Sequence, residues 1–233
     1  MLLFRSLLYF ITSTLVLIVL VSLSMLLVFA PLKTRYGLLS QWSNYCLFAL
    51  KFFCNIKLEV IGKENIPTQP CVIISNHQST WETLGFQQIF PLQTWVLKKE
   101  LLWIPVFGWG LAMLKPIVID RGEKLKALKK VISQGVERLA AGVYVVIFPE
   151  GTRQVYGQLG EYQNGGVAIA KKSNALILPV YHNAGKHWPK GSFIKHPGTI
   201  TVVIGKPIEP GKTQASKLTQ QVYDWTQIQA EKY

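Results

Sequence analysis

A histidine and a glutamate with the spacing of a general-base pair follow a short apolar segment. Residues 71–75 read Cys-Val-Ile-Ile-Ser, and His77 and Glu82 come soon after them. If His77 lies in a loop and Glu82 on the helix that follows, the carboxylate can accept a hydrogen bond from one imidazole nitrogen. The other nitrogen can then take a proton from a substrate. A structural explanation also fits, because residues 79–82 have the pattern of a helix capping box with Ser79 as the cap.

A second polar segment stands at the end of another apolar stretch. Residues 148–153 read Phe-Pro-Glu-Gly-Thr-Arg. A glycine turn at this place can expose backbone N–H groups, and Arg153 can bind a phosphate through two parallel hydrogen bonds. Taken alone, a plain turn with a solvated arginine explains the segment equally simply.

Two further segments combine charged residues with apolar neighbours. One begins Lys98-Lys99-Glu100-Leu101 and continues to Trp109, and the other is Ile119-Asp120-Arg121. Each by itself is typical of a charged surface loop. The common catalytic motifs are missing from the sequence: it has no GxGxxG, no HExxH and no serine flanked by glycines two residues away on both sides, and residues 205–213 fail as a phosphate-binding loop by one residue and two prolines.

Together, the order and spacing of these segments resemble the 1-acyl-sn-glycerol-3-phosphate acyltransferase family, the PlsC-type glycerolipid acyltransferases. The family motif NHxSxxD is matched by Asn76, His77, Ser79 and Glu82, KxELxxxPxxGW by Lys98, Glu100, Leu101, Pro105, Gly108 and Trp109, FPEGTR by residues 148–153, and the late proline block by Leu178-Pro179-Val180. Two positions depart from the family. Glu82 replaces the commoner aspartate, and Gln163 stands where members often have a basic residue, so it cannot supply a charge to a phosphate.

The resemblance implies transfer of an acyl chain from acyl-CoA or acyl carrier protein to the sn-2 hydroxyl of lysophosphatidic acid, forming phosphatidic acid in phospholipid biosynthesis. His77 would be the base, and Glu82 would orient it. The acceptor phosphate and its pocket would involve Arg153, Glu150, Gly151, Thr152, Lys98 and Arg121. We expect no metal or cofactor, and membrane lipids rather than nucleic acid as a further partner.

Other reactive residues have simpler explanations. We expect Ser79 to be a helix cap rather than a nucleophile, and Cys71 to belong to the core of a strand. His182, His187 and His196 are expected to be loop residues, since no set of cysteines or carboxylates accompanies them. The basic residues Lys186, Lys190 and Lys195 could meet anionic lipid or an acidic carrier protein, or could simply keep the surface soluble.

The elements that must position these residues follow from the hydrophobic pattern. Apolar runs predict strands over residues 71–75, 94–97, 116–119, 143–148, 175–180 and 199–204, and the intervening patterns predict helices over residues 79–90, 123–141, 165–174 and 212–232. Alternating strands and helices predict an α/β fold with a mostly parallel sheet flanked by helices. We assign residues 57–233 to this acyltransferase domain.

The first 56 residues are expected to form membrane-anchoring or interfacial helices. Residues 6–32 carry no charge, and a helix over residues 6–30 would extend roughly 37 Å, enough to cross a bilayer core. A cleaved signal peptide usually has a shorter apolar region, of about 7–15 residues. Residues 36–56 fit an interfacial helix or an ordinary helix packed on the core, and the two stretches could also form a hairpin in one leaflet. Basic residues are denser after residues 6–32 than before them, which favours a catalytic domain in the cytoplasm, at the inner membrane of a bacterial cell.

Composition narrows the class of protein. The chain has 233 residues, a formal net charge of +13, 49% hydrophobic residues and 16% charged residues, which excludes a disordered chain. Its three cysteines make neither a disulfide framework nor a CxxC pair, so we expect a reducing compartment. Two alternatives remain: an acyltransferase for glycerol-3-phosphate or another lysolipid, and a non-catalytic basic protein tethered to the membrane.

Overall fold

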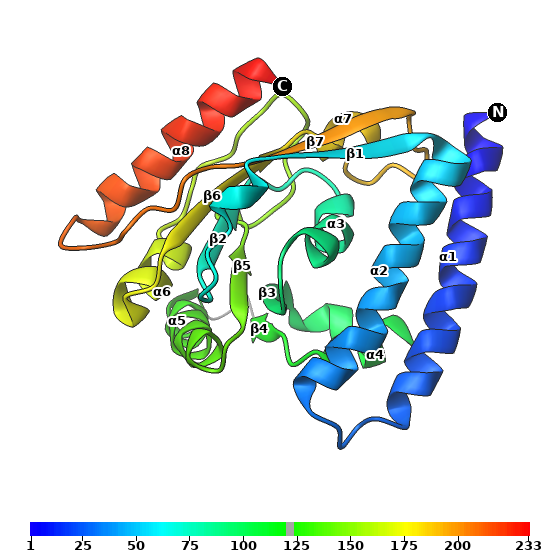
Figure 1. The fold of residues 1–233 in the computed structure, drawn as a ribbon, viewed down its shortest axis with the longest axis horizontal. Helices are drawn as coiled ribbons and strands as arrows, with labels where there is room; N and C mark the ends of the chain where they lie inside the picture. Colours follow the sequence, from blue (N-terminus) through cyan, green and yellow to red (C-terminus); the bar gives the residue numbers. More distant parts are fainter. Residues whose placement is uncertain (120–123) are drawn as a thin grey trace.

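A single mixed sheet forms the centre of the protein in the computed structural model, which describes residues 1–119 and 124–233 (Figure 1). Within these residues it has seven strands, in the order β1-β7-β6-β2-β5-β3-β4. Their bounds are β1 Ile56–Ile61, β2 Val72–Ser75, β3 Gln93–Lys98, β4 Ile117–Ile119, β5 Tyr144–Ile147, β6 Ile177–His182 and β7 Gly198–Ile204. Neighbouring strands pair in parallel except β6 and β7, which are antiparallel. The predicted α/β fold with a mostly parallel sheet is therefore confirmed.

Helices precede the sheet and connect its strands. Their bounds are α1 Leu2–Met25, α2 Leu32–Cys54, α3 Trp81–Ile89, α4 Phe107–Met113, α5 Lys124–Ala140, α6 Gly165–Ser173, α7 Ala184–His187 and α8 Ala215–Lys232, with short 3-10 helices η1 Lys63–Asn65 and η2 Lys99–Trp103. The hydrophobic pattern did not predict β1, α4 or α7. Helices α4 and α7 are too short to show a clear periodicity, whereas β1 does alternate, at Ile56, Leu58 and Val60, directly after an apolar helix.

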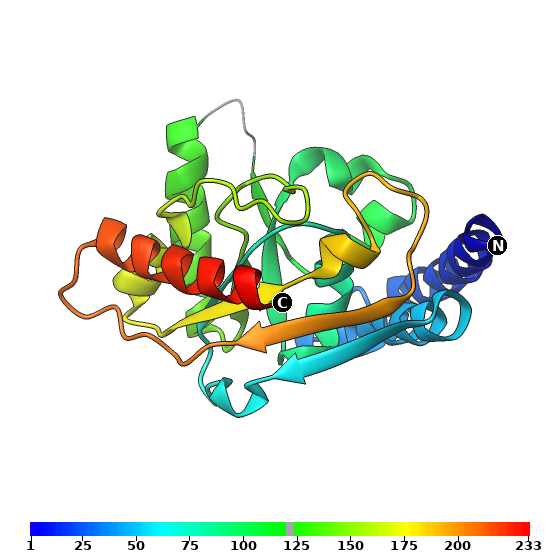
Figure 2. The same cartoon turned by 90° about the horizontal axis from the view of Figure 1, so that it is seen from above.

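The two faces of the sheet bury two different cores. Successive side chains of a strand point to opposite faces, so Ile73 and Val146 belong to the core under α1–α4, whereas Val72 and Val145 belong to the core under α5, α6 and α8. Figure 2 shows α5 and α8 on one side of the molecule and α1 and α2 on the other. Both faces are thus covered, which explains why the central strands read as continuous apolar runs.

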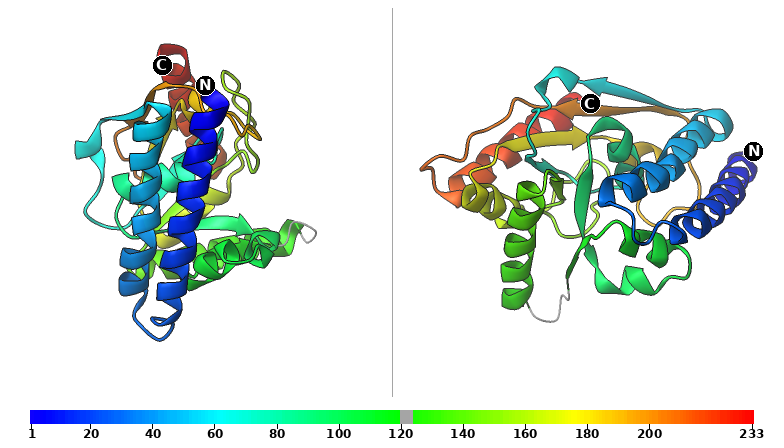
Figure 3. Two further views of the ribbon diagram at one scale, coloured as in Figure 1. Left: turned by 90° about the vertical axis from the view of Figure 1, so that its right-hand side faces the viewer. Right: turned by 60° about the horizontal axis from the view of Figure 1, so that its bottom comes forward.

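Helices α1 and α2 lie side by side as an antiparallel pair (Figure 3). Their residues share one core with the sheet, because Leu39 and Leu50 of α2 cluster with Ile200 and Val202 of β7. This arrangement corresponds to the helical hairpin, one of the arrangements of the two N-terminal stretches between which the sequence did not decide. The predicted boundary between the N-terminal helices and the acyltransferase domain, after residue 56, falls within β1. The hairpin and the sheet share one hydrophobic core.

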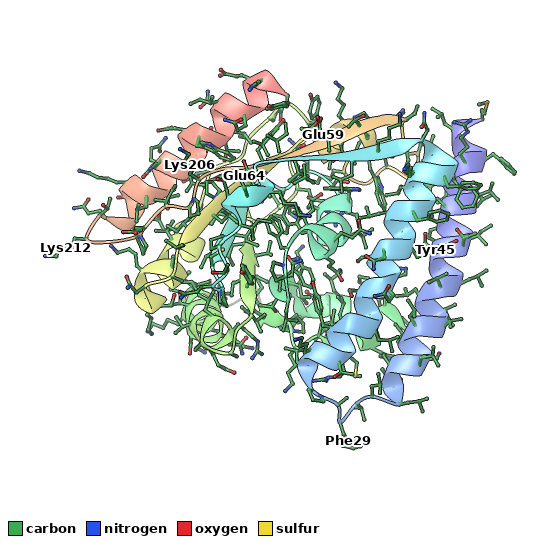
Figure 4. All side chains as sticks on the ribbon, in the orientation of Figure 1. Phe29, Tyr45, Glu59, Glu64, Lys206 and Lys212 are labelled. Carbon is green, nitrogen blue, oxygen red and sulfur yellow. The ribbon has the colours of Figure 1, made fainter. Side chains whose placement is uncertain are left out.

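The outward face of α1 is apolar and its inward face is partly polar. Its buried residues are Ser6, Tyr9, Ser13, Val21 and Ser24, whereas its exposed large side chains include Leu3, Phe4, Leu7, Phe10, Ile11, Leu15, Ile18 and Val19. At the turn between the two helices, Phe29 is 98% exposed and points away from the molecule (Figure 4). This pattern is the reverse of a surface helix in water. Helix α1 is also long and apolar enough to cross a membrane.

The core under α5, α6 and α8 can be tested with two isoleucines on helices. Ile169 of α6 is fully buried, whereas Ile228 of α8 is 60% exposed. We expect Ile169→Ala to lower the free energy of unfolding by about 2–5 kcal/mol, because it removes packed methyl groups and leaves a cavity. The matched Ile228→Ala should change it by less than about 0.5 kcal/mol. Urea unfolding in detergent measures both, and equal losses would contradict this description of the core.

Candidate active site

The predicted site residues follow three neighbouring parallel strands. His77 comes after β2, Phe148 after β5, and Lys98 ends β3. Because β2, β5 and β3 are adjacent and parallel, their carboxyl ends lie at one edge of the sheet. This edge is where ligands usually bind in open α/β sheets.

His77 and Glu82 form a hydrogen-bonded pair at this edge. Nδ1 of His77 lies 2.6 Å from Oε1 of Glu82, and the glutamate side chain is wholly buried. A carboxylate only accepts hydrogen bonds, so Nδ1 carries the proton of the neutral ring. Nε2 is then available as a base, on a ring that lines a cavity.

The capping-box explanation holds at the same time. Helix α3 begins at Trp81, with Thr80 rather than the expected Ser79 in the cap position. The Trp81 N–H donates to Oγ of Ser79 at 3.1 Å, and the Ser79 N–H donates to Oε1 of Glu82 at 2.9 Å. The same oxygen accepts from the Gln78 N–H at 3.0 Å. One buried oxygen therefore both caps the helix and binds the histidine, and the two explanations are not exclusive.

The surroundings of Glu82 favour its charged form. Burial by itself raises the pKa of this carboxyl, but the imidazoles of His182 and His77 and the Ser79 N–H lower it more strongly, so the pKa lies below its ordinary value. Glu82 is therefore an anion at neutral pH. Such an anion can stabilise an imidazolium that forms during proton transfer.

The segment after β5 holds His77 in place. The imidazole stacks on Phe148, with ring centroids 4.2 Å apart and planes 12° from parallel. The His77 N–H donates to Oε2 of Glu150 at 2.7 Å, and the Gln154 N–H donates to the His77 carbonyl at 2.7 Å. These contacts fix both the main chain and the ring of the histidine.

The Glu150 side chain links the loop of His77 to the loop of Gly160. Its second oxygen, Oε1, accepts from the Gly160 N–H at 2.9 Å, so both oxygens bind main-chain N–H groups of the protein. Burial raises the pKa of Glu150 to about 7, and the nearby Glu82 raises it too, against the lowering by the hydrogen bonds from Gly160 and His77. The expectation that Glu150 shapes the acceptor pocket thus takes a specific form: it positions the loops around the pocket.

A cavity of about 840 Å³ joins most of the predicted site residues. Its walls include His77, Lys98, Gly151, Thr152 and Arg153. Glu82 and Glu150 lie outside its lining, and Arg121 lies outside the described residues. Lys190 is a further basic residue of the lining. The structure therefore brings His77 and three basic side chains to one cavity, an arrangement that suits a phosphate-bearing acceptor.

The remaining walls are mostly apolar and come from distant parts of the chain. They include Leu17 and Val21 of α1, Leu39 of α2 and Leu111 of α4. Gln163 also lines the cavity, so the position where the family often has a basic residue faces the site without a charge. A cavity with cations on some walls and aliphatic side chains on others suits an amphipathic ligand.

Three expectations about basic residues were wrong. His182 ends β6 and is wholly buried, and His187 lies in α7 and is 7% exposed, so neither is a loop residue. Lys195 is 3% exposed, because its Nζ lies among aromatic rings, at 4.6 Å from the centroid of Trp188 and 5.0 Å from that of Tyr9. Cations bind favourably over such rings. Local sequence carried no sign of these contacts, since Tyr9 is far from Lys195 in the chain.

The raised pKa of Glu150 predicts a specific pH dependence of stability. Between the ordinary carboxyl pKa and about 7, the folded protein holds a proton at Glu150 that the unfolded chain has released. Its contribution to stability is therefore present in acid and is lost as the pH rises to about 7. Glu150→Gln cannot ionise and should lack this loss.

Thermal unfolding in detergent checks this expectation. From about pH 5 to about pH 8, the midpoint of the wild type should fall relative to that of Glu150→Gln. Glu137→Gln, at a glutamate with a 68% exposed side chain on α5, is the control and should follow the wild type. A constant difference between the wild type and Glu150→Gln across this range would contradict the prediction.

Comparisons with known proteins agree with this geometry. Residues 57–183 match the acyltransferase family. The 1-acyl-sn-glycerol-3-phosphate acyltransferase of Pseudomonas aeruginosa is 45% identical over 199 residues, which cover 84% of this chain and 77% of that protein. The 1-acyl-sn-glycerol-3-phosphate acyltransferase alpha of Homo sapiens is 32% identical over 136 residues, which cover 58% of this chain and 48% of that protein.

A solved structure shares the fold over nearly the whole chain. The crystal structure of the 1-acyl-sn-glycerophosphate acyltransferase PlsC from Thermotoga maritima has a TM-score of 0.81 at 23% identity, and the match covers 99% of this chain and 95% of that one. The family match and the relative from Pseudomonas aeruginosa together show that the chain belongs to the acyltransferase family of 1-acyl-sn-glycerol-3-phosphate acyltransferases.

Proposed function

We propose that the protein transfers an acyl chain from an acyl thioester to the sn-2 hydroxyl of 1-acyl-sn-glycerol-3-phosphate, forming phosphatidic acid. The observation that carries this proposal is the 2.6 Å contact between His77 and Glu82, made beside a cavity that also presents Arg153 and Lys98. The relatives of the same name, at 45% and 32% identity, support it.

The reaction follows from the chemistry of the pair. Nε2 of His77 takes the proton of the sn-2 hydroxyl as its oxygen attacks the thioester carbonyl. The Glu82 carboxylate stabilises the imidazolium. The tetrahedral intermediate then collapses, the C–S bond breaks, and the thiolate takes the proton from His77. The thioester is already activated, so the reaction needs no acyl-enzyme, metal or cofactor.

The cations of the cavity suit the phosphate of the acceptor. Arg153 can bind two phosphate oxygens with its planar guanidinium, and Lys98 adds a second positive charge. Gly151 and Thr152 lie on the same wall. The resemblance implies that Arg121 binds the same phosphate, and the proposal includes it.

The apolar walls suit acyl chains, and the same helices suit a membrane. Side chains of α1, α2 and α4 line the cavity, and the outer face of α1 is apolar. The protein therefore associates with a membrane from which a lysolipid can enter. The excess of basic residues after α1 favours a catalytic domain facing the cytoplasm, at the inner membrane of a bacterial cell. Either acyl-CoA or acyl carrier protein can bring the thioester.

An acyl-transfer assay tests the function. Purified protein is given lysophosphatidic acid with either acyl-CoA or acyl carrier protein as donor, and phosphatidic acid is measured. We expect His77→Ala to lose roughly 10²–10⁴-fold in rate, which is the usual contribution of a general base. His196→Ala, at an exposed histidine, is the matched control. Activity confined to glycerol-3-phosphate or another lysolipid would favour the related acyltransferase, and binding unaffected by His77→Ala without any turnover would favour the non-catalytic protein.

The phosphate-binding role predicts an effect on acceptor affinity. Arg153→Ala should raise the KM for lysophosphatidic acid about tenfold or more with a smaller change in kcat, because a charge-assisted hydrogen bond contributes about 1.5–3 kcal/mol. The variant and the wild type should act alike on a monoacylglycerol, which lacks the phosphate. Arg138→Ala is the control, since Arg138 pairs with Glu137 on α5. An unchanged KM for lysophosphatidic acid would place Arg153 outside the phosphate site.

A further inference from the structure

A second histidine approaches the Glu82 carboxylate. His182 ends β6, is wholly buried and does not line the cavity. Its Nε2 lies 3.9 Å from Oε1 of Glu82, the oxygen that binds His77. One carboxylate oxygen is therefore close to two imidazoles, of which only that of His77 can reach a substrate.

The hydrogen bonds of His182 define its tautomer. Nε2 lies 2.9 Å from the Asn76 carbonyl oxygen, which only accepts, so Nε2 carries the proton. Nδ1 accepts from the Ala184 N–H at 3.3 Å. Burial lowers the pKa of His182, against the raising effects of Glu82 and the Asn76 carbonyl. The ring is thus neutral, and the positive end of its N–H dipole lies near the buried carboxylate.

His182 is also tied to the loop that carries His77. The Asn76 amide donates to the His182 carbonyl at 2.9 Å, and the His182 N–H donates to the Asn76 side-chain oxygen at 3.0 Å. These bonds prolong the pairing of β2 with β6, which ends at Ser75 and Val180. The side chain of Asn76 therefore takes the place of a main-chain hydrogen-bond partner where β2 ends and the loop that carries His77 begins.

The Glu82 carboxylate is held through only one of its two oxygens. Its three hydrogen bonds all go to Oε1, and Oε2 is buried with no hydrogen-bond partner among the described residues. Bonds to one oxygen hold that atom, but they restrict the rotation of the carboxylate plane only weakly. The Nε2 atom of His182 lies 3.9 Å from that same Oε1. The His182 ring is itself held by the Asn76 carbonyl and by the neighbouring rings of Phe86 and Trp81, whose centroids lie 5.9 Å and 6.3 Å away.

We propose that His182 is a positioning residue for Glu82 in acyl transfer, matched to the glutamate that replaces the aspartate common in the family. The inference rests on the proposed function. An aspartate at this position would be shorter by one methylene, so without a shift of the main chain its oxygens could not occupy the position of Oε1 close to both imidazoles. His182 thus acts through Glu82 and Asn76 and does not contact the substrate.

Two substitutions separate the roles of the ring nitrogens. His182→Gln can keep a donor near the position of Nε2, whereas His182→Asn can keep only the acceptor near Nδ1. We expect His182→Asn to lower kcat about tenfold or more. His182→Gln should stay within about threefold of the wild type in kcat, and the KM for lysophosphatidic acid should be unchanged in both because His182 is not a cavity residue. His187→Gln is the matched control at another buried histidine.

Thermal unfolding is measured for each variant together with its rate, so that a loss of the fold can be told apart from a loss of positioning. Full kcat in a folded His182→Asn, or a kcat loss above about tenfold in a folded His182→Gln, would overturn the proposal. If His182→Asn does not fold, the result for folded His182→Gln is used alone, and a kcat loss above about tenfold in that variant overturns the proposal. A rise in KM without a change in kcat in either variant would also overturn it.

A double-mutant comparison tests the match with glutamate. In a Glu82→Asp background, His182→Asn should cost less than in the wild type, because the shorter side chain does not reach the position of Oε1 beside the His182 ring. Equal fold losses in the two backgrounds would contradict the pairing. Absence of wild-type activity on lysophosphatidic acid would instead refute the proposed function, and the same series on whichever acceptor is active would still decide the role of His182.

Discussion

The buried carboxylate of Glu82 is the constraint on which the active site depends. A charge removed from water is costly unless hydrogen bonds replace its hydration. Here Oε1 receives the N–H groups of Gln78 and Ser79 and Nδ1 of His77. Satisfying this one oxygen shapes the loop between β2 and α3, and the same geometry turns the histidine so that Nε2 is available as a base.

The rest of the site is built to keep that loop in place. Glu150 accepts the His77 N–H from one side, and Asn76 pairs with His182 on the other. Phe148 supports the ring by stacking. Reactive groups that must be aligned within a fraction of an ångström require such supporting contacts. Some motif residues thus face the cavity, and the others keep those residues in position through hydrogen bonds and packing.

The N-terminal helices belong to the catalytic unit as well as to the membrane. Their inner faces share a core with the sheet and line the cavity, while the outer face of α1 is apolar. A substrate with a phosphate and an acyl chain needs both environments. Packing the hairpin on the face of the sheet that also carries α3 and α4 places the cations and the aliphatic walls around one space.

Sequence alone determined the fold class, the main helices and strands, the apolar N-terminus and the order of the motifs, because hydrophobic periodicity and motif spacing are local properties of the chain. It also identified His77 and Glu82, whose spacing alone fitted either a dyad or a capping box, and the family resemblance favoured the dyad. Only the tertiary structure showed that both exist, that Glu150 binds main-chain groups, and that His182 and Lys195 are buried. These contacts join residues far apart in the chain, such as His182 and Asn76. Their hydrogen bonds and packing arise only when the strands are brought together, so they leave no pattern in the local sequence.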